Sequence, residues 1–143
     1  MPAKTKARKK IERWFDSQNR TLFDFQVKTW DAWQHGQSGL VHSPTGSGKT
    51  LAAWLGPVQD ELKRQNESAD AQPSSGLKLL WITPLRALAN DTAENLRQAA
   101  SALGCQWNIQ IRTGDTPASE RQKQRTSAPV SYTHLTLPTI LRV

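Results

Sequence analysis

An eight-residue turn, Ser-Pro-Thr-Gly-Ser-Gly-Lys-Thr at residues 43–50, constrains this chain more than any other feature. It follows a short apolar run at residues 39–42 and precedes Leu-Ala-Ala-Trp-Leu at residues 51–55. This order predicts a strand, a glycine-rich turn and a helix. The backbone N–H groups of such a turn can surround a polyphosphate, and the N-terminal end of the helix favours the anion. The sequence therefore predicts a nucleotide-binding domain.

The pattern also assigns roles within the turn. We expect Lys49 to reach the β- and γ-phosphates of the nucleotide and the Thr50 hydroxyl to bind Mg²⁺. These are the two candidate catalytic residues, and Thr50 is the candidate metal ligand. The strict pattern opens with Gly, whereas this turn opens with Ser43. The other expected phosphate-binding residues are Thr45, Gly46, Ser47 and Gly48.

Strands and helices alternate along the rest of the chain. Three segments read as helices with apolar residues, a fourth reads as a polar helix, and three short apolar or alternating runs have the length of strands. The predicted helices cover residues 23–33, 50–64, 87–103 and 118–125, and the predicted strands cover residues 39–42, 77–83 and 107–112. Such alternation predicts an α/β fold with a parallel sheet flanked by helices. Ligands of these sheets bind at the carboxyl ends of the strands.

The formal net charge of +7 is concentrated at the start of the chain. The first ten residues contribute +5, which leaves +2 for the remainder. We expect residues 1–10 to be a disordered basic arm, either simply solvated or contacting phosphates in a salt-dependent way.

Other features limit the possible classes of protein. Cys105 is the only cysteine, so an intrachain disulfide is impossible, and the three histidines lack the spacing of a metal site. The basic start lacks the apolar segment of a secretory signal, and no apolar run has the length of a membrane span. We expect a cytoplasmic protein without a membrane partner.

Three further features bear on ligands, and each also has an ordinary structural interpretation. The side-chain amide of Gln26 offers a donor beside an acceptor, which matches the edge of adenine, but an exposed helix glutamine would look the same. Arg86 stands in the first turn of a predicted helix just after Pro84, where a cation and free N–H groups would clamp a phosphate. The third feature is the segment from Gly114 to Thr116, whose small residues would let a nucleic-acid backbone phosphate come close, although an ordinary turn would look the same.

Together these residues resemble the start of a superfamily 2 DEAD/DEAH-box helicase of the large helicase-related (Lhr-type) group, which includes the ligase-associated DEXH-box helicases. The resemblance covers residues 14–129 and is most specific at residues 25–30, 39–55 and 83–89. It implies a RecA-like P-loop domain, ATP and Mg²⁺ as cofactors, and single-stranded DNA as partner. It also implies a link to DNA repair and its ligase or nuclease systems.

The resemblance gives each motif a role. It implies that Gln26 reads adenine and that Lys49 and Thr50 hold the phosphates and Mg²⁺ of ATP. Two segments are implied to grip the sugar–phosphate backbone of one strand. Their residues are Pro84 and Arg86 in one, and Gly114, Asp115 and Thr116 in the other.

The chain departs from the family pattern after residue 129. Residues 131–143 resemble translated sequencing-adapter sequence, and we expect this tail not to be native, although Tyr, Thr and Leu would also suit a divergent strand. We interpret residues 11–130 as the N-terminal part of the ATP-binding domain. The sequence contains no Asp-Glu-x-His or Asp-Glu-x-Asp box and no second RecA-like domain. Because phosphoryl transfer needs such groups to stabilise charge, we expect this truncated chain alone not to hydrolyse ATP.

Two other interpretations remain open. One is a different P-loop enzyme, such as a small-molecule kinase, although the absence of an Asn-Lys-x-Asp motif disfavours a GTPase. It would be favoured if Gln26→Ala left ATP affinity intact. The other is a non-catalytic nucleic-acid-binding module that uses the basic arm. It would be favoured if deletion of residues 1–10 removed all DNA affinity.

Overall fold

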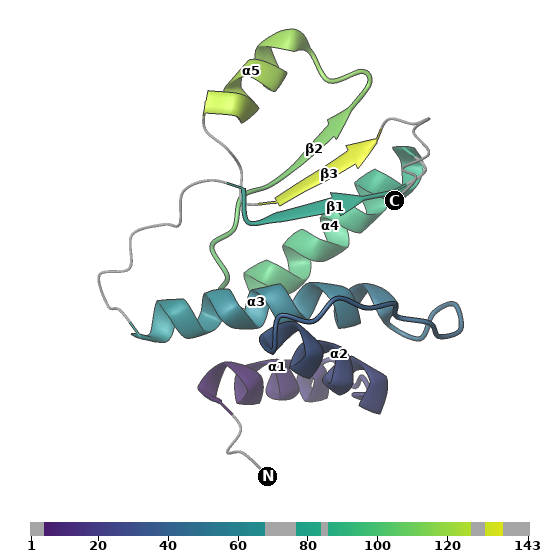
Figure 1. Ribbon diagram of the computed structural model, residues 1–143, viewed down its shortest axis with the longest axis vertical. Helices are drawn as coiled ribbons and strands as arrows, with labels where there is room; N and C mark the ends of the chain where they lie inside the picture. Colours follow the sequence, from purple (N-terminus) through teal and green to yellow (C-terminus); the bar gives the residue numbers. More distant parts are fainter. Residues whose placement is uncertain (1–4, 68–76, 84–85, 127–130, 136–143) are drawn as a thin grey trace. The chain divides into compact units, whose positions relative to one another are not determined.

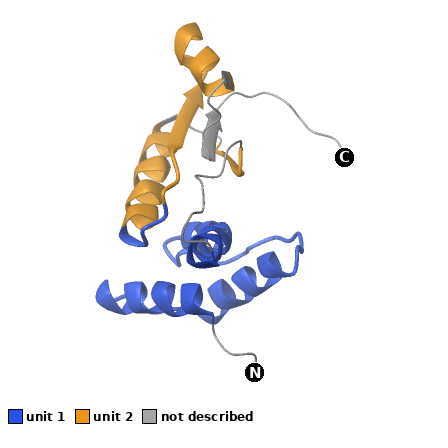
Figure 2. Cartoon of the chain, turned by 90° about the vertical axis from the view of Figure 1, so that its left-hand side faces the viewer, with its two compact units in different colours: residues 1–71, 102–105 blue, residues 72–101, 106–143 orange. Residues whose placement is uncertain are grey.

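The computed structural model describes residues 5–67, 77–83, 86–126 and 131–135, with residues 86, 126 and 131–135 described by their backbone (Figure 1). Its elements, in chain order, are α1 (Lys6–Ser17), α2 (Asp24–Gln34), α3 (Lys49–Glu67), β1 (Leu79–Ile82), α4 (Arg86–Ala102), β2 (Ile109–Thr113), α5 (Ala118–Thr126) and β3 (Ser131–Leu135). The chain divides into two compact units. The first comprises residues 1–71 and 102–105, and the second comprises residues 72–101 and 106–143 (Figure 2).

The first unit has a helical core in which α1 and α2 both pack against α3. Its largest fully buried side chains include Trp30 and Trp54. Phe15 meets Trp30 edge to face, with ring centroids 6.0 Å apart, a favoured geometry for aromatic pairs. At Gly56 an added Cβ would lie 3.0 Å from Cβ and Cγ of Trp33, so glycine permits the close approach of α2 and α3. The helices predicted over residues 23–33 and 50–64 are confirmed.

The disordered arm predicted over residues 1–10 is wrong for residues 6–10, because Lys6 to Lys10 form the start of helix α1. Two contacts explain the difference. The Thr5 side chain caps the helix by accepting from the Arg8 N–H at 3.2 Å. Apolar side chains at helical spacing, Ala7 and Ile11 among them, are buried. The basic residues of this segment therefore belong largely to a helix with one buried face.

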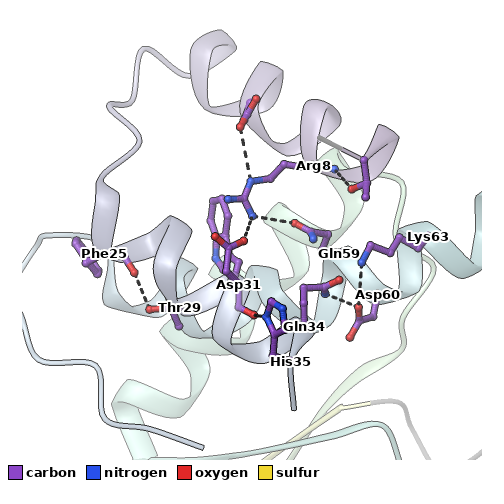
Figure 3. Close-up of polar contacts among 12 residues, drawn as sticks. Arg8, Phe25, Thr29, Asp31, Gln34, His35, Gln59, Asp60 and Lys63 are labelled. Atoms are coloured by element: carbon purple, nitrogen blue, oxygen red, sulfur yellow. Dashed lines mark hydrogen bonds and ion pairs between the residues drawn. The ribbon is translucent and has the colours of Figure 1, made fainter. Parts of the chain in front are cut away.

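Arg8 lies on that buried face and connects α1 to its neighbours (Figure 3). Its side chain is 8% exposed, and its guanidinium stacks 4.7 Å from the ring centroid of Trp30. The same group donates to Oε1 of Gln59 on α3 at 3.3 Å and lies 3.5 Å from the carboxylate of Asp31 on α2. A cation counted as surface charge in the sequence is thus part of the packing of three helices.

The second unit contains a parallel three-stranded sheet in the order β1-β3-β2 (Figure 1). Ser131 of β3 is in register with Leu79 of β1 on one side and with Ile109 of β2 on the other. Helix α4 is tied to β2 by Arg97, whose Nε and Nη2 both donate to the Ile109 carbonyl, at 3.1 and 2.9 Å. A parallel sheet combined with helices confirms the α/β fold class.

Strand β3 falls in the tail that we expect not to be native. Residues 131–135 complete the sheet, as the divergent-strand interpretation anticipates. Parallel pairing on both sides requires only a segment of strand-forming residues such as Tyr132 and Thr133. The origin of the tail and the proposed domain boundaries remain predictions.

The strand predicted over residues 39–42 is wrong for this structure. These residues have no strand assignment, and Leu40 is 92% exposed. A strand is defined by hydrogen bonds to a neighbour, and in the described part of the chain β1, β2 and β3 pair with one another and with no further segment. The apolar run before the turn therefore pairs with none of these strands. No helix of the described residues is both long and apolar enough to cross a membrane.

Candidate nucleotide and nucleic-acid sites

The glycine-rich turn leads directly into α3, as the sequence predicts, with Lys49 as the first helical residue. Gly46 and Gly48 have φ angles of 78° and 88°, in the left-handed region that favours glycine. At Gly48 a Cβ would also lie 2.6 Å from Nε2 of Gln26. Both the backbone conformation and the available space therefore require glycine at position 48.

The side chain of Lys49 lies over the turn. Its Nζ donates to the carbonyl oxygens of Ser43 at 2.6 Å and Pro44 at 2.7 Å. The Ser43 hydroxyl lies 2.6 Å from the Ser47 hydroxyl, which also donates to the Pro44 carbonyl at 2.6 Å. Ser43, which departs from the strict motif, thus makes a contact within the loop that glycine could not make.

The groups around this turn fit a nucleoside triphosphate with its magnesium ion. Lys49 supplies an ammonium group that now satisfies two neutral carbonyls, and phosphate oxygens would be stronger acceptors. Thr50 is exposed in the first turn of α3, where its hydroxyl is accessible. Thr45 and Gly46 are also exposed, so the N-terminal end of a 19-residue helix is open to an anion.

Gln26 is buried, only 1% exposed, and its amide bridges α2 to the turn. Oε1 accepts from the backbone N–H of Phe23 at 3.0 Å, and Nε2 donates to the Gly48 carbonyl at 3.1 Å. The first bond is one half of a capping box, because Phe23 is the N-cap of α2 and Gln26 its third residue. Each end of the amide keeps one further hydrogen-bonding capacity. Its role in reading adenine remains a prediction.

The loop after β2, residues 113–116, is a hydrogen-bonded turn in the second unit. Its Thr116 N–H donates to the Thr113 carbonyl at 3.2 Å, and the Thr113 N–H donates to Oγ1 of Thr116 at 2.8 Å. The Asp115 N–H donates to Oγ1 of Thr113 at 3.3 Å. Gly114 and Asp115 are exposed and Thr116 is half-buried, so the predicted contact residues form one structured loop.

The other predicted nucleic-acid segment is described in part. Arg86 is the first residue of α4, at the position in a helix where the sequence analysis places it. Pro84 lies outside the described residues. Thr83, which precedes it, is 5% exposed.

Sequence reasoning missed two residues that shape these sites. Phe23 supplies the N–H that holds Gln26, and the N-cap-to-N3 spacing was the signal that could have revealed it. Arg121 donates to the backbone of the 113–116 loop, and a single arginine in a polar helix carries no signal of such a role.

The fold places the chain among the RecA-like helicase domains. One similar solved structure is Mycobacterium smegmatis helicase Lhr bound to ssDNA and AMP-PNP, with a TM-score of 0.70, 29% identity, and coverage of 87% of this chain and 16% of that one. Another is the DUF1998 helicase MrfA bound to DNA and AMPPNP, with a TM-score of 0.70 and 23% identity over 92% of this chain and 17% of that one. The MrfA likeness concerns the fold.

The sequence defines the family. The family model for the DEAD/DEAH box helicase matches residues 23–142, and the chain therefore belongs to this family. Relatives include the Lhr helicase/uracil glycosylase of Escherichia coli, 35% identical over 116 residues, which cover 73% of this chain and 8% of that protein. The ATP-dependent helicase Lhr-Core of Methanocaldococcus jannaschii is 30% identical over 131 residues, 85% of this chain and 15% of that protein. The chain thus spans only a small part of the length of these relatives.

Proposed function

We propose that this chain is the nucleotide-binding part of an ATP-dependent helicase or translocase that acts on single-stranded DNA. The observation that carries the proposal is the turn at residues 43–50. It combines two left-handed glycines, a lysine ammonium and an exposed threonine hydroxyl at the start of α3. These groups would bind the triphosphate of ATP and its Mg²⁺. When bound, the magnesium ion would neutralise phosphate charge.

Adenine selection is assigned to Gln26. Its amide is already fixed by Phe23 and Gly48, and each of its ends keeps one further hydrogen-bonding capacity that could serve the base. The same contact joins the base-reading residue to the phosphate-binding loop. Membership in a family of ATP-dependent helicases supports this assignment.

Nucleic-acid binding is assigned to Pro84 and Arg86 and to Gly114, Asp115 and Thr116. Two similar structures are helicases bound to DNA, one of them to ssDNA, which supports DNA as the ligand. The loop of residues 114–116 offers the Gly114 N–H and the Thr116 hydroxyl, and backbone N–H groups and hydroxyls commonly contact phosphates. We propose DNA repair as the process, with a ligase or nuclease system as partner, because the Lhr-type resemblance points there.

Titration of a fluorescent ATP analogue with and without Mg²⁺ tests the nucleotide assignment. We expect saturable binding that is strengthened by Mg²⁺ and displaced by ATP more effectively than by GTP. Equal displacement by GTP would favour a different P-loop enzyme. A labelled oligothymidylate then tests the nucleic-acid assignment. Loss of all affinity on replacement of the exposed Lys6, Lys9 and Lys10 by alanine would favour the binding-module interpretation.

A further inference from the structure

We propose that Arg121 is a positioning residue that holds the loop of residues 113–116 in the conformation that receives a nucleic-acid phosphate. The proposal rests on the proposed function of that loop and adds a residue that the motif itself does not include. Arg121 lies on α5, five positions after Thr116.

The guanidinium group of Arg121 donates hydrogen bonds to three carbonyl oxygens of the loop. Nε of Arg121 donates to the Thr116 carbonyl at 2.8 Å, and Nη2 donates to the Gly114 carbonyl at 2.5 Å. A longer contact of 3.4 Å joins Nη2 to the Thr113 carbonyl. The planar donor fork of arginine can serve several acceptors at once, whereas lysine offers a single nitrogen.

These bonds determine which backbone groups the loop presents to solvent. In a planar trans peptide, the carbonyl oxygen and the following N–H point to opposite sides. Because the carbonyls of Thr113 and Gly114 point toward Arg121, the N–H groups of Gly114 and Asp115 are directed away from it. Gly114 and Asp115 are also exposed. An approaching phosphate would therefore meet the Gly114 N–H, because the Asp115 N–H donates to Thr113 within the loop. The carbonyls that would repel the phosphate face a cation.

The hydroxyl of Thr116 is also oriented by a hydrogen bond within the loop. Its oxygen accepts from the Thr113 N–H at 2.8 Å, so its own hydrogen is left to donate elsewhere. Arg121 holds the backbone carbonyl of this same residue. Position and donor direction of the Thr116 hydroxyl therefore both depend on contacts within the loop.

Helix α5 is anchored independently of Arg121. Gln124, three residues later and only 2% exposed, donates from Nε2 to the Ile111 carbonyl of β2 at 3.2 Å. Residues three apart lie on the same side of a helix, so Gln124 fixes the face from which Arg121 reaches the loop. Loss of Arg121 should thus change the loop while the helix stays attached.

The test compares three variants in binding a fluorescein-labelled oligothymidylate by anisotropy at one fixed salt concentration. Arg121→Ala removes charge and hydrogen bonds, and Arg121→Lys keeps the charge but loses the fork. Arg125→Ala is the matched control, because Arg125 is exposed on the same helix and makes none of the loop contacts. Circular dichroism checks folding, and amide hydrogen exchange reports on residues 113–116.

We expect both Arg121 variants to bind about tenfold more weakly, with faster exchange in the loop, because hydrogen bonds from a charged donor are lost. Arg125→Ala should change affinity by about twofold, as expected for one surface charge. If Arg121→Ala does not fold, Arg121→Lys decides. If Arg121→Lys binds as tightly as the wild type while Arg121→Ala binds weakly, the positive charge and not the positioning of the loop would account for the effect of Arg121. Wild-type binding by both would overturn the inference alone, whereas no binding by the wild-type chain would overturn the proposed function as well.

Discussion

The side-chain amide of Gln26 donates to the backbone carbonyl of Gly48 at 3.1 Å, joining α2 to the glycine-rich turn. Gln26 is buried, and a Cβ at position 48 would lie 2.6 Å from its Nε2. A residue predicted to select the base therefore also supports the loop predicted to hold the phosphates.

Gln26→Ala should consequently weaken the binding of ATP and destabilise the first unit. The substitution leaves the Phe23 N–H and the Gly48 carbonyl without their partner, which costs about 1–3 kcal/mol for a buried group. Urea unfolding and titration with a fluorescent ATP analogue measure the two effects. Gln37→Ala is the control, because Gln37 is exposed and makes no side-chain hydrogen bond in the described structure. Unchanged ATP affinity in Gln26→Ala would contradict the adenine assignment.

Lys49→Ala should abolish most of the nucleotide affinity of this chain. A charge-assisted hydrogen bond contributes about 1.5–3 kcal/mol, so we expect a loss of about tenfold to a hundredfold. Lys28→Ala is the matched control, since Lys28 is an exposed lysine of α2 paired with Asp24. Isothermal titration with ATP and Mg²⁺ makes the comparison, and equal affinity in the two variants would rule out the nucleotide site.

Arg8→Ala should destabilise the first unit although Arg8 lies in a basic segment. It removes the stacking on Trp30 and the hydrogen bond to Gln59, which together are worth about 1–3 kcal/mol. Lys9→Ala removes an exposed charge from the same helix and should stay within about 0.5 kcal/mol of the wild type. Urea midpoints measure both variants, and a similar small effect in each would show that Arg8 is not part of the packing.

Gly56→Ala places two opposing effects in competition. Alanine favours a helix over glycine by about 0.5–1 kcal/mol, but the new Cβ would lie 3.0 Å from Trp33. Overpacking typically costs about 1–3 kcal/mol, so we expect net destabilisation. Gly39→Ala is the control, since an added Cβ there meets nothing within 4 Å. Thermal unfolding distinguishes them, and a stabilised Gly56→Ala variant would mean that α2 can move away from α3.

Local sequence patterns were sufficient to predict most of the helices and strands. Each of α2 to α5 coincides with a predicted helix to within a few residues, because apolar periodicity and glycine or proline stops act over one or two turns. β1 also lies inside its predicted range, and β2 ends one residue beyond its own. The strand predicted over residues 39–42 failed because a strand exists only when another segment pairs with it, and pairing is not a property of the run itself.

The sequence by itself determined the α/β class, the helicase family and the position of the glycine-rich turn before α3. These follow from residue order and from the conformational freedom of Gly46 and Gly48. Only the tertiary structure decided that Gln26 meets Gly48, that Arg8 is buried against Trp30, and that Arg121 gathers the carbonyls of the 113–116 loop. The physical reason is that such contacts depend on where separate segments come to lie, and burial then determines which polar groups must be paired.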